Sequence, residues 1–271
     1  MTENSLNAVV SQRVEVAPGL CILRVVPDAW PDNEFKPGQF VLLGLPGTAE
    51  RCPMSEPEDE PPKPGKLIIR AYSIASSSVH REYLEFYLTL VRSGALTPRL
   101  FNLKIGDRLY ISPKYSGFFT LDEVPADANL ILVATGTGLA PYMSMVRTQL
   151  VNRVRQRTAV IHGARNSWDL GYRAELIMME RFCPGFSYLP IISEPDKEPV
   201  RWGGHVGFIQ DLWRAGAVEK IWGAPPTPQD THVFLCGNPK MIEAMSELLE
   251  AQGFKRHSRK NPGQYHVEEY W

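Results

Sequence analysis

Short hydrophobic segments separated by turns make up the first part of the chain. The segments are rich in branched and aromatic residues, and Pro-Gly and Gly-Asp pairs lie between them, a pattern typical of short antiparallel strands. The clearest strands are expected at residues 7–16, 20–26, 39–45, 66–73 and 83–91. A tight turn in LKIGDRLYIS, residues 103–112, predicts a further strand. Strands of this kind usually close into a small barrel or a sandwich.

The hydrophobic pattern changes near residues 122–128. A nearly continuous apolar run at 130–134 is typical of a parallel strand buried on both faces. Strands are then expected at 157–164, 186–193 and 231–237, and helices at 141–150, 172–182 and 239–253. This alternation predicts a parallel sheet with crossover helices. The 271 residues are therefore expected to form two domains, residues 1–124 and 125–271.

One Pro-rich and acidic segment, residues 46–66, has no periodicity. We expect it to be an exposed insertion between two strands of the first domain. Long surface loops are accommodated at small entropic cost, so a tolerated loop without a function is the plainer interpretation.

The composition narrows the class of protein. A net charge of −1 gives no support to nucleic-acid binding. No apolar run reaches the roughly 18 residues of a membrane helix, and the polar start MTENSLNAVV does not resemble a signal peptide. The four cysteines form neither a CxxC pair nor an iron–sulfur spacing, so no metal site is expected and a reduced, cytoplasmic setting is the simplest interpretation. Nothing in the sequence indicates an oligomeric state.

Two segments of the first domain carry candidate chemistry. In RAYSIASS, Arg70 could neutralise a phosphate, Tyr72 could cover a flat ring, and Ser73 could hydrogen-bond a ring nitrogen. In SGALTPRL, Gly94 would let the backbone approach a ligand, and Thr97 could begin a helix whose free amides suit a pyrophosphate. Each segment alone is also compatible with an ordinary strand end or helix cap.

Two segments of the second domain point to a nucleotide. ATGTGLAP follows a buried strand and precedes a helix, as a dinucleotide-binding loop does, although Pro141 replaces the last Gly of GxGxxG. The next strand ends with Arg165 in place of an acidic residue. LCGNPKM places Cys236 and Gly237 at a later strand end, where open parallel sheets bind ligands. A buried structural role is the alternative for Cys236, and simple packing is the alternative for the aromatic ending QYHVEEYW.

Taken together, these motifs resemble those of the bacterial type of the ferredoxin (flavodoxin)–NADP reductase family, in the same order over nearly the whole chain. RAYS resembles the flavin motif RxYS, and GALT followed by LKIGD resembles a pyrophosphate-binding segment. GTGLAP, HGAR and CGNP are similar to nicotinamide dinucleotide motifs. The ending HVEEYW is similar to the HVEVY ending of the plant enzymes and to the EHYW ending of the enterobacterial ones.

The resemblance implies an N-terminal antiparallel Greek-key β-barrel that binds FAD and a C-terminal α/β domain that binds NADP(H) or NAD(H). It implies hydride transfer between the nicotinamide and the flavin, coupled to one-electron exchange with ferredoxin or flavodoxin. Ser73, Cys236 and Glu268 would take part in catalysis. The residues implied to bind the two cofactors are Arg70, Ala71, Tyr72, Ser73, Gly94, Ala95, Leu96, Thr97, Thr135, Gly136, Thr137, Gly138, Arg165, Arg173, Ser193, Glu194, Cys236, Gly237, Asn238, Tyr270 and Trp271.

The chain departs from the family pattern where the adenosine 2′-phosphate would bind. NADP enzymes of the family often carry Ser-Arg or Thr-Arg after the strand that here ends in PIIS, whereas this chain has Ser193 and Glu194. A carboxylate there would repel a 2′-phosphate and could bind ribose hydroxyls. Against this, Arg165 is present, and Lys197, Arg173 or Arg201 could reach a phosphate. NADP is the family default, and NADH use stays open.

Two other functions compete with a free-standing reductase. The chain could be the reductase component of an oxygenase system, although it has no cysteines for a fused iron–sulfur cluster. It could also be a flavin-containing electron-transfer subunit of a larger complex, which the intact nucleotide motifs disfavour.

Overall fold

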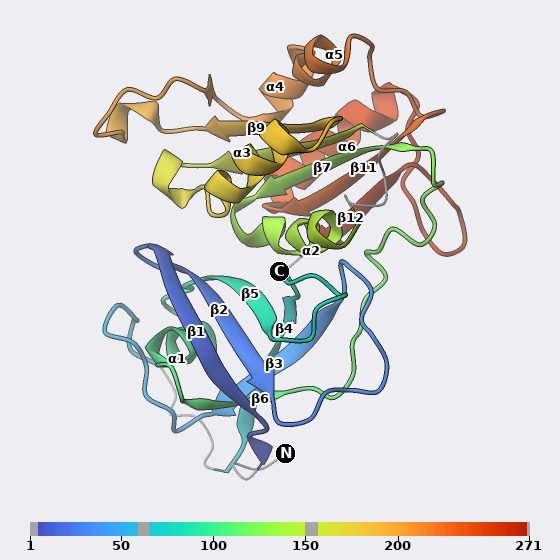
Figure 1. Ribbon diagram of the computed structural model, residues 1–271. Coiled ribbons are helices and arrows are strands. Elements are labelled where there is room, and N and C mark those ends of the chain that lie inside the picture. The colour runs from blue at the N-terminus through green and yellow to red at the C-terminus, as the bar shows by residue number, and fades with distance from the viewer. Residues whose placement is uncertain (1–4, 59–64, 150–156, 270–271) are drawn as a thin grey trace. The chain divides into compact units, whose positions relative to one another are not determined.

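The structure, a computed structural model, describes residues 5–58, 65–149 and 157–269 (Figure 1). Contacts within the chain divide it into two compact units. The first comprises Met1–Thr120 and Ala140–Thr148, and the second comprises Leu121–Leu139 and Gln149–Trp271. Each unit is described by itself.

The first unit is built on an antiparallel sheet of six strands in the order β4-β3-β6-β1-β2-β5. The strands are β1 (Ala8–Ala17), β2 (Leu20–Pro27), β3 (Phe40–Pro46), β4 (Leu67–Ser73), β5 (Leu84–Thr89) and β6 (Arg108–Ile111). β4 and β5, at opposite ends of this order, also contact each other, so the sheet curls into a barrel. Along β2, Cys21, Leu23 and Val25 are wholly buried at alternate positions, as the period of two requires.

Two helices belong to this unit, α1 (Thr97–Asn102) and α2 (Ala140–Gln149). α2 is fixed to the barrel by a buried carboxylate on β5. Glu85 is wholly buried, and both Arg147 Nη1 of α2 and Arg24 Nε of β2 donate to it at 2.6 Å. This pairing joins residues far apart in the chain, and the hydrophobic pattern gives no sign of it.

The second unit is built on a parallel sheet in the order β10-β9-β8-β7-β11-β12. The strands are β7 (Asn129–Thr135), β8 (Thr158–Ala164), β9 (Phe186–Ile192), β10 (His205–Val206), β11 (Thr231–Gly237) and β12 (Tyr265–Glu269). The helices are α3 (Arg173–Phe182), α4 (Ile209–Arg214), α5 (Ala217–Trp222) and α6 (Pro239–Ala251). α4 and α6 pack together, and their apolar side chains share one core with alternate residues of the central strands, such as Ile131, Val133 and Leu235.

The predicted fold class, an antiparallel barrel followed by an α/β domain with a parallel sheet, is confirmed. The apolar runs predicted most elements within one or two residues of their bounds. The sequence pattern missed α4, α5, β10 and β12. β12 was missed because its sequence, YHVEE, mixes polar and apolar residues without a buried run, and it forms a strand through pairing with β11.

The Pro-rich insertion lies between β3 and β4, as expected, but its described part is only partly exposed. Pro53, Glu56 and Pro57 face solvent, whereas Cys52 is 4% exposed and its amide donates to Pro98 O of α1 at 2.9 Å. The expectation of an exposed insertion is therefore wrong for Cys52, which is buried and hydrogen-bonded to α1.

Candidate functional site

The end of β4 presents the RAYS motif. Arg70 and Ala71 are exposed, whereas Tyr72 packs against the barrel core and Ser73 is 5% exposed. Burial raises the pKa of the Tyr72 phenol, and the nearby Arg70 guanidinium partly offsets this rise. The Arg70 guanidinium donates to Ile69 O at 2.8 Å. A charged group, a neutral phenol ring and a shielded hydroxyl therefore follow one another at the carboxyl end of this strand.

The loop before α1 presents backbone amides. The amide of Gly94 donates to Val91 O at 2.9 Å, and the Thr97 hydroxyl exchanges two hydrogen bonds of 3.1 Å with the backbone of Val91. Within residues 5–58, 65–149 and 157–269, the amides of Ala95, Leu96 and Thr97 have no hydrogen-bond acceptor. Three successive unpaired amides can bind an anionic oxygen.

The carboxyl ends of β7 and β11 come together closely in the second unit. A Cβ on Gly138 would lie 2.4 Å from Cys236 O, and a Cβ on Gly237 would lie 2.2 Å from the Thr135 hydroxyl oxygen. The same Thr135 hydroxyl accepts a 2.7 Å hydrogen bond from the amide of Asn238. Glycine is therefore required at both positions, and the structure brings the predicted GTGLAP and CGNP motifs together at this edge of the sheet.

Cys236 and Glu268 are neighbours on paired strands. Cys236 of β11 stands opposite Glu268 of β12 in the parallel register. The Cys236 side chain is wholly buried, while Glu268 is partly exposed. The buried thiol fits both alternatives that the sequence left open, a packing residue and a group beside a ligand. Tyr270 and Trp271, predicted to cover a ring, lie outside the described residues.

The ends of β8 and β9 bring the predicted 2′-phosphate residues together. The amide of Glu194 donates to Arg165 O at 2.9 Å, and that of Ser193 donates to Ala164 O at 3.1 Å. Lys197 Nζ lies 2.6 Å from Glu194 Oε2, and this hydrogen bond is the main reason that the pKa of Glu194 is lowered. The negative charge of Glu194 and the positive charge of Lys197, both near the predicted 2′-phosphate position, are thus paired with each other.

Other charged side chains surround this edge. The Arg173 guanidinium lies 4.7 Å from the ring centre of Trp202, a cation–π distance. Glu198 accepts two hydrogen bonds of 2.6 Å from the amide and hydroxyl of Ser167. Burial raises the pKa of Asp169, partly offset by Arg165.

Sequence reasoning overlooked His162, the first residue of HGAR. Its ring is wholly buried in β8, and Nδ1 lies 3.3 Å from the Tyr188 hydroxyl. Burial lowers its pKa to about 4, although the backbone of Gly136 acts in the opposite direction. A neutral imidazole therefore lies beside the glycine loop. The sequence signal that could have identified His162 is a single histidine in an otherwise apolar strand.

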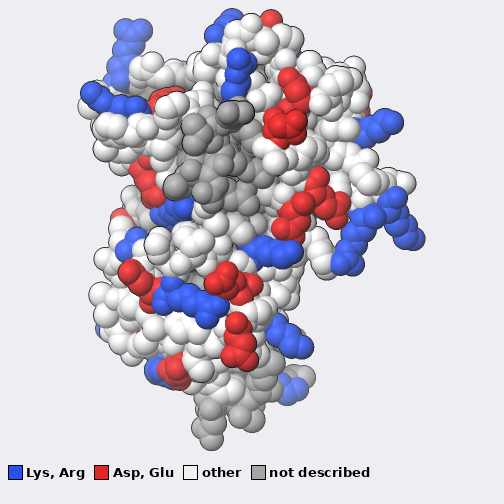
Figure 2. Space-filling model, turned by 45° about the vertical axis from the view of Figure 1, so that its right-hand side comes forward, with Lys and Arg blue, Asp and Glu red and all other residues white. Residues whose placement is uncertain are grey.

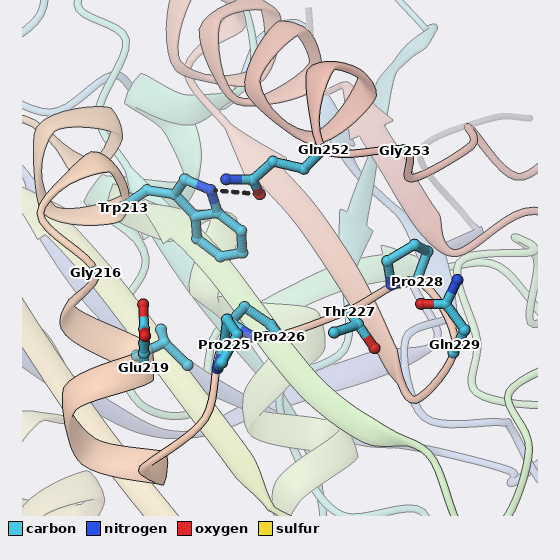
Figure 3. Close-up of a pocket in the computed structure, with 11 residues that line it drawn as sticks. Trp213, Gly216, Glu219, Pro225, Pro226, Thr227, Pro228, Gln229, Gln252 and Gly253 are labelled. Atoms are coloured by element: carbon cyan, nitrogen blue, oxygen red, sulfur yellow. Dashed lines mark hydrogen bonds between the residues drawn. The ribbon is translucent and has the colours of Figure 1, made fainter.

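A separate pocket of about 570 Å³ lies in the second unit, lined by the Pro225–Pro228 stretch, Trp213 and Gln252 (Figure 3). The Pro225–Pro228 stretch leads into β11 and Gln252 directly follows α6, whereas Trp213 belongs to α4, so the pocket is at the opposite end of β11 from Cys236. It contains none of the predicted site residues.

The face in Figure 2 shows basic and acidic side chains interspersed. No helix in the described part of the chain is long and apolar enough to cross a membrane.

Comparisons with known proteins identify relatives that align with most of the chain. Residues 132–247 match the oxidoreductase NAD-binding domain family. The chain is 34% identical over 242 residues to a flavodoxin/ferredoxin–NADP reductase of Buchnera aphidicola subsp. Baizongia pistaciae, covering 89% of this chain and 90% of that protein. It is 33% identical over 248 residues to a ferredoxin–NADP reductase of Azotobacter vinelandii, covering 88% and 87%. The fold matches that of a ferredoxin NADP⁺ reductase from Neisseria gonorrhoeae with bound FAD and NADP, at a TM-score of 0.80, 22% identity and 98% coverage of both chains.

Proposed function

Because this chain belongs to the flavodoxin/ferredoxin–NADP reductase family, we propose that it exchanges electrons between a nicotinamide dinucleotide and ferredoxin or flavodoxin through bound FAD. The observation that carries the proposal is the close approach of the Gly138 loop to Cys236 at the carboxyl edge of the parallel sheet. That edge is where open α/β sheets bind nucleotides. We place the protein in the cytoplasm, because its four cysteines are all free, as is usual in a reducing compartment.

The residues of the first unit fit FAD. The unpaired amides of Ala95, Leu96 and Thr97 offer donors for a pyrophosphate, and exposed Arg70 offers a positive charge for it. The Tyr72 ring suits an isoalloxazine face, and the Ser73 hydroxyl suits a ring nitrogen. Held there, FAD would supply the redox chemistry that couples two-electron hydride transfer from a nicotinamide to one-electron transfer to a carrier protein.

The residues of the second unit fit a dinucleotide. Gly136, Thr137 and Gly138 would receive its pyrophosphate, because the 3₁₀ turn at Gly136–Leu139 follows β7 directly. Cys236 and Glu268 would orient the nicotinamide, and the buried thiol would keep water from its reacting face. Arg165, Arg173, Ser193 and Glu194 would line the adenosine end. We assign residues 1–124 to the flavin domain and 125–271 to the nucleotide domain.

The proposal is tested on the purified full chain. We expect one noncovalent FAD per chain, reducible by NADPH or NADH in a stopped-flow experiment. Ferricyanide, and then ferredoxin or flavodoxin, serve as electron acceptors for the reduced protein. A chain that turns over with ferricyanide alone acts as an independent enzyme, whereas a flavoprotein that neither nucleotide reduces contradicts the proposal. A protein that holds FMN, or that cannot be loaded with FAD, contradicts it at the first step.

A further inference from the structure

Two arginines bind the carbonyls of the loop that precedes α1. Arg51 of the insertion donates to Gly94 O and to Arg92 O, each at 3.0 Å. Arg99 of α1 donates from Nη1 to Ala95 O at 2.6 Å. Both guanidinium groups are largely buried, with side-chain exposures of 14% for Arg51 and 2% for Arg99. The carbonyls of this loop are therefore held on one side by fixed positive groups.

Glu58, from the acidic insertion, joins the two arginines. Its carboxylate accepts two hydrogen bonds of 2.8 Å from Arg99, and Arg51 Nη1 lies 3.0 Å from Glu58 Oε1. Gly47 O accepts the remaining Arg99 donors at 3.1 and 2.6 Å, so each of its five N–H groups has an acceptor. Arg99 lowers the pKa of Glu58, so the carboxylate is ionised at neutral pH. Bidentate pairs of this kind fix orientation as well as charge.

The fixed carbonyls determine where the loop amides point. In a planar trans peptide the C=O and the following N–H lie on opposite sides of the chain. The Gly94 carbonyl accepts from Arg51, so the Ala95 amide points away from that arginine. The Ala95 carbonyl accepts from Arg99, so the Leu96 amide points away from Arg99. Both belong to the loop's three successive amides, Ala95 to Thr97, that have no acceptor among the described residues.

We propose that Glu58, Arg51 and Arg99 form a clamp that positions the Ala95 and Leu96 amides for the pyrophosphate of FAD. The inference rests on the proposed function, since it takes FAD as the ligand of this loop. It gives part of the acidic insertion a role: Glu58 is a positioning residue that acts through the two arginines. Its charge is neutralised by them on the carbonyl side of the loop, so it does not repel the anion on the amide side.

The test compares two flavins on the full-length protein. FAD carries a pyrophosphate, whereas riboflavin carries no phosphate, so loss of amide positioning weakens FAD alone. For Glu58→Gln, the FAD dissociation constant, measured by flavin fluorescence during equilibrium exchange, is expected to rise about 5- to 30-fold, the factor produced by about 1–2 kcal/mol. The riboflavin dissociation constant is expected to change less than about twofold. Arg51→Gln, which removes the donors to Gly94 and Arg92, is expected to act in the same direction.

Asp28→Asn is the matched control, because it removes a carboxylate paired with one arginine, Arg108, on the exposed surface of the same barrel. It is expected to leave both dissociation constants unchanged. Equal weakening of FAD and riboflavin in Glu58→Gln would show a general structural role and overturn the inference, as would unchanged FAD binding. A wild-type protein that binds neither flavin would instead refute the proposed function, so the two failures are distinguishable.

Discussion

The nucleotide preference of this protein is expected to depend on Glu194. Its carboxylate follows β9 and lies 2.6 Å from Lys197 Nζ, on a side chain that is 34% exposed. Lys197 lowers the pKa of Glu194, so the carboxylate is ionised at neutral pH and forms an ion pair with the Lys197 side chain. We therefore expect a weaker preference for NADPH than a free arginine at this position would give, and measurable use of NADH.

Replacing Glu194 by arginine raises the net charge near the expected 2′-phosphate position by two units. It removes the negative charge, adds a positive one, and leaves Lys197 without its carboxylate. A 2′-phosphate carries close to two negative charges. At about 7 Å in water, each pair of unit charges contributes about 0.6 kcal/mol, so a change of two charges acting on two gives about 2.4 kcal/mol before screening. Physiological salt has a Debye length of about 8 Å and reduces this to about 1–1.5 kcal/mol. That corresponds to about a tenfold change in selectivity.

The assay is the ratio of kcat/KM for NADPH to that for NADH, measured on wild type and on Glu194→Arg. The ratio is expected to shift toward NADPH by about tenfold. Raising the ionic strength is expected to shrink the shift, because the interaction is between exposed charges. Glu219→Arg is the matched control, since Glu219 is an exposed carboxylate of α5 beside the pocket at the other end of β11 (Figure 3).

Two results would refute this reasoning. A wild type strongly selective for NADPH, with a ratio that Glu194→Arg leaves alone, would remove Glu194 from the site and assign the phosphate to Arg165, Arg173 or Arg201. An equal shift in Glu219→Arg would show that only the net charge of the chain matters.

Three further predictions concern other parts of the molecule. Ser73→Ala should slow flavin reduction by about 10- to 1000-fold in single turnover while FAD stays bound, the range for removing one positioned polar group; an unchanged rate would exclude Ser73 from the reaction. Removing Tyr270 and Trp271 should change the nicotinamide affinity and the flavin spectrum if a terminal ring covers a base; identical values would assign both rings to packing. His162 is held neutral because burial lowers its pKa from 6.5 to about 4, so between these pH values the unfolded chain binds a proton that the folded chain does not. The free energy of unfolding should therefore fall by up to about 3 kcal/mol as pH drops through this range, and urea unfolding of His162→Gln should show a smaller fall.

The fold could be predicted because its main signals are local. The apolar run of β7 and the alternating burial of β2 both follow from the sequence of a single segment. β12 was missed because HVEE has no such run, and its strand depends on register with β11. The glycines of GTGLAP could also be recognised from the sequence as a motif, and the structure brings this motif beside CGNP. Only the structure explains why residue 138 must be glycine: a Cβ at this position would lie 2.4 Å from Cys236 O.

The charged part of the candidate site could not be predicted because the sequence does not show which charged side chains pair, whether the partner is three residues away, as for Glu194, or 41 residues away, as for Glu58. The sequence does not show whether the charge of Glu194 is neutralised by a neighbour. In the structure, the turn at Pro195–Lys197 brings Lys197 to its carboxylate. Glu58 belongs to a segment whose composition suggests an exposed acidic loop, yet its carboxylate is bound by an arginine 41 residues away. Net charge and local composition therefore describe these residues poorly. Their effect on an anionic ligand depends on which side of the backbone the charge lies and on what already neutralises it. Glu58 is thus no argument against the proposed pyrophosphate site, because it contacts the arginines that bind the carbonyl side of the loop.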